Sequence, residues 1–229
     1  MISIVIPAFN EERNIKKTAT DLIEEFSHAN MPLELVLVDN GSRDNTAQIL
    51  KDLALRYSLI KTVKIDSNEG YGWGILNGLK MCTGSYVGYM GADGQISPKD
   101  AVSVSRKLLS GDFDLCKVRR TIRNDGPIRM FLSKSFNLMF SSLYGISTDD
   151  VNGSPKIMRR SCYEKMKLES KDWFIDAEIM IKAARNGLRI GEVNVEFKER
   201  RAGKSNVSPA TVIEFLKNLL KYKLRVGND

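Results

Sequence analysis

Residues 89–95 read Tyr89-Met90-Gly91-Ala92-Asp93-Gly94-Gln95, and they close a short apolar run that begins at Ser85. The run has the composition of a buried strand, and its end sets one carboxylate and one amide among glycines. Glycine and aspartate also dominate ordinary turns for backbone reasons, so on its own the stretch fits a hairpin turn equally well. A ligand site is favoured because three earlier apolar runs also end in polar loops.

Those three earlier runs each lead through their loop into a helix-like stretch. A strand, loop and helix unit that repeats with short loops is typical of a mainly parallel sheet covered by helices on both faces. In such sheets ligands bind beyond the carboxyl ends of the strands, so we expect all four loops to meet at one site. The earlier runs and their loops are residues 2–7 with 8–12, 35–38 with 39–46, and 60–65 with 66–74.

Two acids, Glu11 and Glu12, follow the first run and have two explanations. In the first, Asn10 is the N-cap of a helix that continues to about Ala29, and the acids lie at the positive end of its dipole. In the second, the acids face the ligand crevice.

Asp39 ends the second run and has no capping duty, because Asp44 or Asn45 can cap the following helix. A carboxylate at a strand end can accept hydrogen bonds from a base or a ribose. Asp39 is therefore a candidate nucleoside contact.

The third loop holds a glycine cluster at Gly70, Gly72 and Gly74. The cluster resembles a dinucleotide-binding motif, but the position of that motif's third glycine is Ile75. We interpret the cluster as backbone that approaches a ligand or packs closely against another segment.

A basic run follows the next predicted helix, residues 98–110, and the next predicted strand, residues 113–118. The run precedes an apolar helix at residues 130–144. It is either a solvated charged face or a set of cations suited to an amphiphile with a phosphate head. Its members are Lys117, Arg119, Arg120, Arg123 and Arg129.

The last part of the chain holds further candidates. Asp176 and Glu178 stand at the start of a predicted helix that ends at Gly187. Acids are common at the start of a helix. Residues 198–206 form a basic loop around Gly-Lys-Ser that lacks the first glycine of a P-loop. Residues 210–226 predict a helix with an apolar stripe opposite lysines, which either packs on the core or lies on an anionic bilayer.

Composition excludes several classes of protein. The chain has 229 residues, 42% of them hydrophobic, and no apolar run as long as a membrane span, so we expect a cytoplasmic globular protein. Three scattered cysteines and one histidine predict neither a disulfide framework nor a zinc site. The formal charge of +7 favours an anionic partner, but no recognised nucleic-acid-binding module is present.

Taken together, these motifs resemble the family-two glycosyltransferases of the GT-A fold. Within that family the chain is most similar to the dolichyl-phosphate mannose synthases and polyprenyl-phosphate glycosyltransferases. The resemblance covers nearly the whole chain. The stretches that carry it are residues 6–12, 38–44, 70–78 and 91–95, with Arg200, Gly203 and Ser205 late in the chain.

The resemblance implies an α/β fold of GT-A, Rossmann-like type, with a mainly parallel sheet, helices on both faces and a single domain at residues 1–229. It implies a nucleotide-binding half at about 1–97, an acceptor-side half at about 98–209 and a C-terminal amphipathic helix at 210–229. The donor nucleotide is expected at Pro7, Ala8, Phe9, Glu11, Val38, Asp39, Ala92 and Ser205.

The resemblance also assigns catalytic roles. Asp93 matches the last acid of the family's D-x-D motif, which holds a divalent cation, Mg²⁺ or Mn²⁺, and Gln95 matches a further ligand. Arg119, and with less support Arg129, match arginines for the acceptor phosphate, while Arg200 and Ser205 match a loop that closes over the diphosphate.

One departure concerns the metal. Gly91 stands where the motif has its first acid, so one ligand or supporting contact is missing. Because Mg²⁺ is commonly held by one or two carboxylates with substrate phosphates and water, the site is either weakened or inactive.

The implied activity is inverting transfer of a hexose from a nucleotide sugar, of the GDP-mannose or UDP-glucose type, to a polyprenyl phosphate at the cytoplasmic membrane face. Such an acceptor is already anionic, so it needs no strong base. Two alternatives stay open: transfer to a glycan hydroxyl, with Asp176 or Glu178 as base, and a non-catalytic nucleotide-binding subunit. Contact with an anionic membrane surface is expected, and contact with nucleic acid is not.

Overall fold

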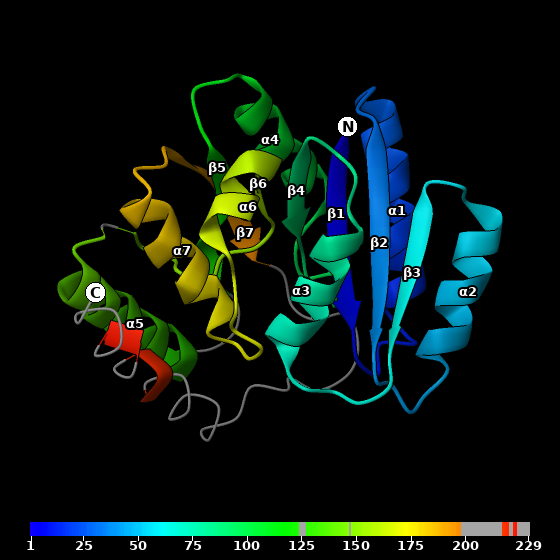
Figure 1. The fold of residues 1–229 in the computed structure, drawn as a ribbon, viewed down its shortest axis with the longest axis horizontal. Helices are drawn as coiled ribbons and strands as arrows, with labels where there is room; N and C mark the ends of the chain where they lie inside the picture. Colours follow the sequence, from blue (N-terminus) through cyan, green and yellow to red (C-terminus); the bar gives the residue numbers. More distant parts are fainter. Residues whose placement is uncertain (124–126, 147, 198–216, 220–221, 224–229) are drawn as a thin grey trace.

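The computed structural model describes residues 1–123, 127–146, 148–197, 217–219 and 222–223. Among these residues the chain forms one seven-stranded sheet with helices on both faces, as predicted (Figure 1). The strands lie in the order β3-β2-β1-β4-β6-β5-β7. Their bounds are β1 Ile2–Ala8, β2 Leu33–Asn40, β3 Ile60–Ile65, β4 Tyr86–Tyr89, β5 Leu115–Arg123, β6 Lys156–Arg159 and β7 Ile190–Phe197.

The four strands of the first half are parallel, as the repeated units predict. β1 pairs with β2 on one side and with β4 on the other, and β2 pairs with β3. Among the described strands, β6 alone runs antiparallel to its neighbours β4 and β5, and β7 is parallel to β5. The carboxyl ends of β1 and β2 therefore lie side by side, at the lower edge of the sheet in Figure 1.

Alternation along the strands supplies an apolar surface to both faces. Ile4 and Ile6 pack with α1, α2 and α4 on one face, while Val5, Val36 and Val38 pack with α3 and α7 on the other. Strands buried on both faces need apolar residues at successive positions, which explains why the first runs are continuously apolar. The helices are α1 Ile15–His28, α2 Thr46–Arg56, α3 Tyr71–Met81, α4 Pro98–Leu109, α5 Pro127–Tyr144, α6 Arg160–Met166 and α7 Ile175–Arg185.

Asn10 is not the N-cap of α1, contrary to the prediction. The helix begins at Ile15 after Asn14, and Asn10 adopts a left-handed conformation with φ of 55°. The Asn10 side-chain oxygen accepts a hydrogen bond from the Arg43 backbone at 2.8 Å, and its own N–H donates to Ser42 at 3.1 Å. The first loop is thus extended by its pairing with the second loop, which the sequence pattern does not reveal.

Asp44 accepts hydrogen bonds at the start of α2, as the prediction allows. Asp44 Oδ1 accepts bonds from the Thr46 backbone at 3.0 Å and from its hydroxyl at 2.6 Å. Glu12 Oε2 accepts from the Asn45 N–H at 3.0 Å, so Glu12 serves the start of α2 and lies outside the first turn of α1. The first two loops therefore brace each other.

Strand β5 extends to Arg123, five residues beyond the predicted end at Val118. Lys117, Arg119 and Arg120 consequently lie within the strand, and the prediction that the arginines follow it was wrong. The strand continues through the basic residues because carboxylates compensate them: Lys117 pairs with Glu192 of β7 at 2.8 Å.

The remaining elements lie close to their predicted bounds. α7 ends at Arg185, and Gly187, with φ of 63°, supplies the predicted glycine stop. β3 has the predicted bounds, and α5 begins three residues before the predicted start.

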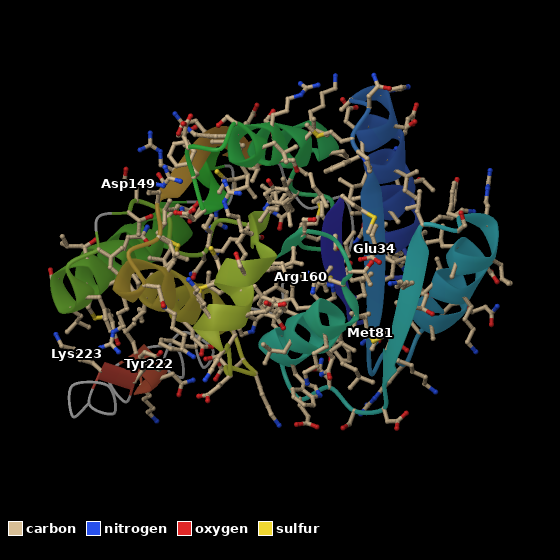
Figure 2. All side chains as sticks on the ribbon, turned by 45° about the horizontal axis from the view of Figure 1, so that its top comes forward. Glu34, Met81, Asp149, Arg160, Tyr222 and Lys223 are labelled. Atoms are coloured by element: carbon tan, nitrogen blue, oxygen red, sulfur yellow. The ribbon has the colours of Figure 1, made fainter. Side chains whose placement is uncertain are left out.

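A third apolar cluster joins α5, the start of α7 and the described part of the C-terminal stretch. Leu219 is fully buried there with Phe140 and Phe174. Tyr222 and Lys223 lie beside the same helices (Figure 2), with the Tyr222 ring 5.3 Å from that of Phe174. Core packing is confirmed for Leu219, and the rest of the predicted apolar stripe lies outside the described residues.

No helix in the described parts of the chain combines the length and apolarity needed to cross a bilayer.

Candidate active site

The strand ends of the first half gather at one edge of the sheet, as predicted. The register sets Ala8 beside Asp39, and β4 runs along the other side of β1. The Thr18 hydroxyl of α1 donates to the Ala92 carbonyl at 3.0 Å, which fixes the loop after β4 against the helix that follows β1. Pro7 and Val38 face each other in the same register.

Asp39 lies at this edge and is 4% exposed. Its Oδ1 accepts a hydrogen bond from the Ser42 N–H at 2.9 Å, and no bond to Oδ2 is found among the described residues. Phe9, half-buried, comes from the neighbouring loop. One oxygen of Asp39 thus orders its own loop and the other is available to a ligand.

Glu11 is held by structural contacts. Its Oε2 accepts from the Asn14 side chain at 2.7 Å, and its N–H donates to the Thr46 hydroxyl at 2.9 Å. It is 7% exposed, so its observed contacts brace the start of α1 against α2. A direct contact with the nucleotide stays a prediction.

Asp93 is the half-buried carboxylate that follows β4. Its Oδ1 accepts from the Gln95 N–H at 3.1 Å, which brings these two side chains to one turn. Among the residues that the structure describes, a Cβ added at Gly91 would meet only the Asp93 carboxylate, with Oδ1 at 3.5 Å. No described residue thus fills the place of the missing acid beside the remaining one.

Asp93 and Gln95 fit a hard divalent cation as a partial ligand set. Carboxylate and amide oxygens suit Mg²⁺, which keeps several waters and takes further ligands from substrate phosphates. The described residues hold no group of three or more histidine, cysteine or acidic side chains suited to a metal.

Tyr71, the first residue of α3, lies between Tyr89 of β4 and Trp173 before α7. The sequence pattern does not predict it as a site residue. Its pKa is raised well above the usual value, first by burial and then by the charges of Asp176 and Asp93, while Ser154 hydrogen-bonds to it. Its ring stacks on that of Trp173 at 4.4 Å. The charges of the acid after β4 and of the acid of α7 therefore both act on Tyr71.

The glycine cluster packs closely, which was one of its two interpretations. A Cβ at Gly70 or Gly72 would lie 2.4 or 2.3 Å from the carbonyl oxygens of Lys171 and Ser170. The Trp73 N–H donates to the Lys171 carbonyl at 2.8 Å. These glycines join the start of α3 to the segment before α7, and so join the two halves beside Tyr71.

The two acids of α7 have different environments. Glu178 is fully buried, and it accepts bonds from the backbone of Glu169 and Ser170 and pairs with Lys182 at 2.6 Å. Its carboxylate ties the preceding loop to the helix. Because these contacts occupy both of its oxygens, neither oxygen is left to accept a proton from a ligand. Asp176 lies near Tyr71, bonded to the Tyr89 hydroxyl at 2.5 Å.

Arg119 and Arg120 point to different places. Arg119, 35% exposed, bonds to Asn194 at 2.8 Å and to Asp149 at 3.0 Å toward β7; Asp149 is labelled in Figure 2. Arg120 makes two bonds to Asp150, at 2.8 and 2.6 Å, and its charge reaches Tyr71. The sequence includes Arg120 in the basic run, but spacing alone does not separate it from Arg119.

Three predicted site residues cannot be placed by side chain. Arg200 and Ser205 lie outside the described residues, as does the whole basic loop 198–206. The backbone of Arg129 belongs to α5, but its side chain is not described. Their assigned roles stay predictions.

The geometry agrees with what related sequences indicate. The sequence model of the family described as "Glycosyl transferase family 2" matches residues 3–167. The chain belongs to that family of glycosyltransferases.

Two relatives extend the match to nearly the whole chain. The "Dolichyl-phosphate beta-glucosyltransferase" of Trichomonas vaginalis is 28% identical, over 98% of this chain and 75% of its own length. The "Undecaprenyl-phosphate 4-deoxy-4-formamido-L-arabinose transferase" of Pseudomonas fluorescens is 30% identical over 96% of this chain. The chain spans 64% of the length of that arabinose transferase.

Solved structures support the fold. Glucosyl-3-phosphoglycerate synthase from Mycobacterium tuberculosis, in complex with Mn²⁺, UDP-glucose and phosphoglyceric acid, superposes with a TM-score of 0.75 at 21% identity. The match covers 97% of this chain and 79% of the synthase chain. The predicted GT-A fold is confirmed.

Proposed function

We propose that this protein is an inverting glycosyltransferase that moves a hexose from a nucleotide sugar to a polyprenyl phosphate. The printed names of both relatives, a dolichyl-phosphate and an undecaprenyl-phosphate transferase, support this acceptor class. The structural observation that carries the proposal is that Tyr89, the last residue of β4 and four residues before Asp93, donates to Oδ1 of Asp176 on α7 at 2.5 Å. The strand that leads to the donor-side acid thus also holds the acid of α7.

The donor is proposed to lie along the carboxyl ends of β1, β2 and β4. The free oxygen of Asp39 accepts from the nucleoside, and Pro7, Ala8, Phe9, Val38 and Ala92 form the surrounding wall. Asp93 and Gln95 would hold Mg²⁺ or Mn²⁺ together with the diphosphate. A bound divalent cation supplies positive charge where negative charge builds up on the leaving nucleoside diphosphate.

The acceptor phosphate is proposed to bind arginines near the end of β5. We add Arg120 to Arg119 and Arg129. Asp150 accepts two hydrogen bonds from the Arg120 guanidinium and so holds it in a fixed orientation. Arginine recognises phosphate through paired N–H bonds. Arg200 and Ser205 keep their proposed role of closing over the diphosphate.

In this reaction an acceptor oxygen bonds to the anomeric carbon as the bond to the diphosphate oxygen breaks. A doubly ionised phosphate monoester has no proton to lose. A singly protonated one passes its proton to Asp176, because the backbone of Glu169 and Ser170 and the side chain of Lys182 occupy both oxygens of Glu178. Because polyprenyl chains reside in a bilayer, we also propose that the protein works peripherally at the cytoplasmic face of a membrane.

One observation favours a second candidate, transfer to a glycan hydroxyl. The carboxylate of Asp176 is fixed by Tyr89 and Lys156, as a general base requires. Under this candidate a hydroxyl acceptor is glycosylated and loss of the arginines leaves transfer unchanged, whereas transfer to a phosphate is lost with the arginines.

The donor side is tested by thermal shift with GDP, UDP, ADP and CDP, each with and without Mn²⁺. A ligand at a hundred times its dissociation constant adds about 2.7 kcal/mol to the free energy of unfolding. We expect one diphosphate to raise the melting temperature, and to do so only with Mn²⁺. A shift without any later turnover would indicate a binding subunit, and no shift with any nucleotide would refute the proposal.

A further inference from the structure

A row of polar side chains crosses four neighbouring strands beneath the site. Tyr89 of β4, Lys156 of β6, Lys117 of β5 and Glu192 of β7 are successive partners in the strand register. Side chains in direct register lie on the same face, here the face that α7 covers. Both lysines are 0% exposed, and burying an ammonium group is costly unless it is paired.

The two ends of this row have different partners. Lys117 pairs with Glu192 at 2.8 Å and donates to the Asp150 carbonyl at 2.7 Å, so it joins strands and the loop before β6. Tyr89 and Lys156 instead reach across to α7, where both bond to the same atom, Oδ1 of Asp176. Among the described residues no hydrogen bond reaches Oδ2 of Asp176.

This asymmetry fixes the direction of the carboxylate. Two donors from adjacent strands hold one oxygen, so the second oxygen has a set orientation while remaining free to accept from a ligand. The ring of Tyr71 meets the Tyr89 ring edge-on at 6.5 Å, and Tyr89 ends β4, the strand that leads to Asp93. The held carboxylate therefore lies beside the end of β4, which the proposed donor site also uses.

We propose that Tyr89 and Lys156 are positioning residues that act on transfer through Asp176. The inference rests on the proposed function, in which Oδ2 of Asp176 receives the acceptor's proton. As the acceptor oxygen bonds to the anomeric carbon, the electron pair of the breaking bond leaves with the nucleoside diphosphate. Lys156 supplies the positive charge beside the Asp176 carboxylate, and Tyr89 keeps its free oxygen aimed at the acceptor.

A purely structural role would make the same contacts, so the test must separate the two. Tyr89→Phe removes one hydroxyl and keeps the ring. Its effect on kcat is measured alone and together with Asp176→Asn, using a nucleotide sugar and a polyprenyl phosphate. If Tyr89 acts through Asp176, the two losses do not multiply.

We expect Tyr89→Phe to lower kcat about tenfold, or about 1.4 kcal/mol of barrier, with an unchanged KM for the donor. In the Asp176→Asn background it should lower kcat no further. Tyr144→Phe is the matched control, because its hydroxyl bonds to the Leu219 carbonyl at 2.8 Å, among the contacts of the C-terminal segment. This variant should keep the full kcat.

The inference would be overturned if Tyr89→Phe kept the wild-type kcat. It would also be overturned if Tyr89→Phe lowered kcat by the same factor with Asp176 present and with Asp176→Asn. Either result would leave the proposed function intact. A wild-type protein that binds nucleotide but transfers no sugar would overturn both. Lys156→Met leaves a buried carboxylate uncompensated and can fail to fold. The double variant Lys156→Met/Asp176→Asn removes both charges and should recover the melting temperature but not the activity; recovered activity would overturn the inference.

Discussion

Gly91 leaves a single carboxylate, that of Asp93, where the related motif has two acids. The backbone at Gly91 does not require glycine, since no left-handed φ is found there and, among the described residues, an added Cβ would meet only Asp93. The described part of the fold therefore leaves room to begin a side chain and does not impose the missing acid.

Gly91→Asp should strengthen the cation site, because a second carboxylate beside Asp93 adds a hard oxygen ligand. We expect the Mn²⁺ concentration that half-saturates nucleotide-induced stabilisation to fall about tenfold, which corresponds to about 1.4 kcal/mol. The measurement is a Mn²⁺ titration followed by thermal shift at constant nucleotide. Ser58→Asp, an exposed substitution before β3 that adds the same charge, is the control; equal Mn²⁺ dependence in the two variants would contradict the account.

Glu34, at the start of β2, is a buried acid outside the site (Figure 2). Burial raises its pKa, but hydrogen bonds from Lys61, Ser3 and Thr83 outweigh that effect and lower it from 4.5 to about 2. Because the folded pKa lies below the unfolded one, Glu34 stabilises the fold fully above pH 4.5. This contribution is lost as the pH falls toward about 2.

Glu34→Gln should therefore flatten the acid limb of stability. Between pH 4.5 and about 2, the free energy of unfolding should fall less steeply with pH in the variant than in the wild type. Urea unfolding at a series of pH values measures this slope. Glu24→Gln, exposed on α1, is the control; if both variants keep the wild-type slope, the assigned role of Glu34 is wrong.

At the scale of elements, the start of α3 is fitted against the segment before α7. Gly70 and Gly72 allow this approach, and Lys171 lies 4.2 Å from the centre of the Trp73 ring. The contact sets Tyr71 on Trp173 and thereby shapes the junction of the two halves.

Gly72→Ala should open this contact, because the added Cβ would lie 2.3 Å from the Ser170 carbonyl oxygen. Overpacking of this kind costs about 1–3 kcal/mol of unfolding free energy, which urea denaturation can resolve. Gly91→Ala is the matched substitution, with its nearest atom at 3.5 Å. We expect it to keep wild-type stability, and equal losses in both variants would refute the packing argument.

Apolar runs predicted the elements of the first half well, because strands buried on both faces must be continuously apolar. The place of Asp39 follows from that pattern alone, whereas β3 is an edge strand in which exposed positions alternate with half-buried ones after Ile60. The extent of β5 does not follow from the apolar pattern, since Arg119 and Arg120 break it and their compensating acids, Asp149 and Asp150, are distant in the sequence.

The candidate site was predictable where one loop supplies its residues. Asp93 and Gln95 come from the same turn. Asn10, Tyr71 and Lys156 were not predictable, because their partners come from segments that only the folded chain brings together. The role of Glu178 was not predictable for the same reason. Its position indicates an acid at a helix start, but its partners show that it joins the preceding loop to the helix.

At the scale of the whole molecule, one sheet carries both halves of the proposed reaction. The parallel strands β1, β2 and β4 present the proposed donor loops. β6, which comes from the second half of the chain, pairs directly with β4 in the sheet. The described C-terminal residues add to the cluster of α5 and α7, where the Tyr144 hydroxyl bonds to the Leu219 carbonyl at 2.8 Å. The acceptor side is thus built from segments far apart in sequence.

The central claim is that this fold transfers a hexose to a polyprenyl phosphate with the help of Asp93. The most direct measurement incubates the full chain with GDP-mannose or UDP-glucose labelled in the sugar, Mn²⁺ and a polyprenyl phosphate, and follows label in the lipid fraction. We predict labelled lipid with the wild type, and none with Asp93→Asn or without the cation. Label that appears only on a glycan hydroxyl acceptor, or equal lipid labelling by Asp93→Asn, would contradict the account.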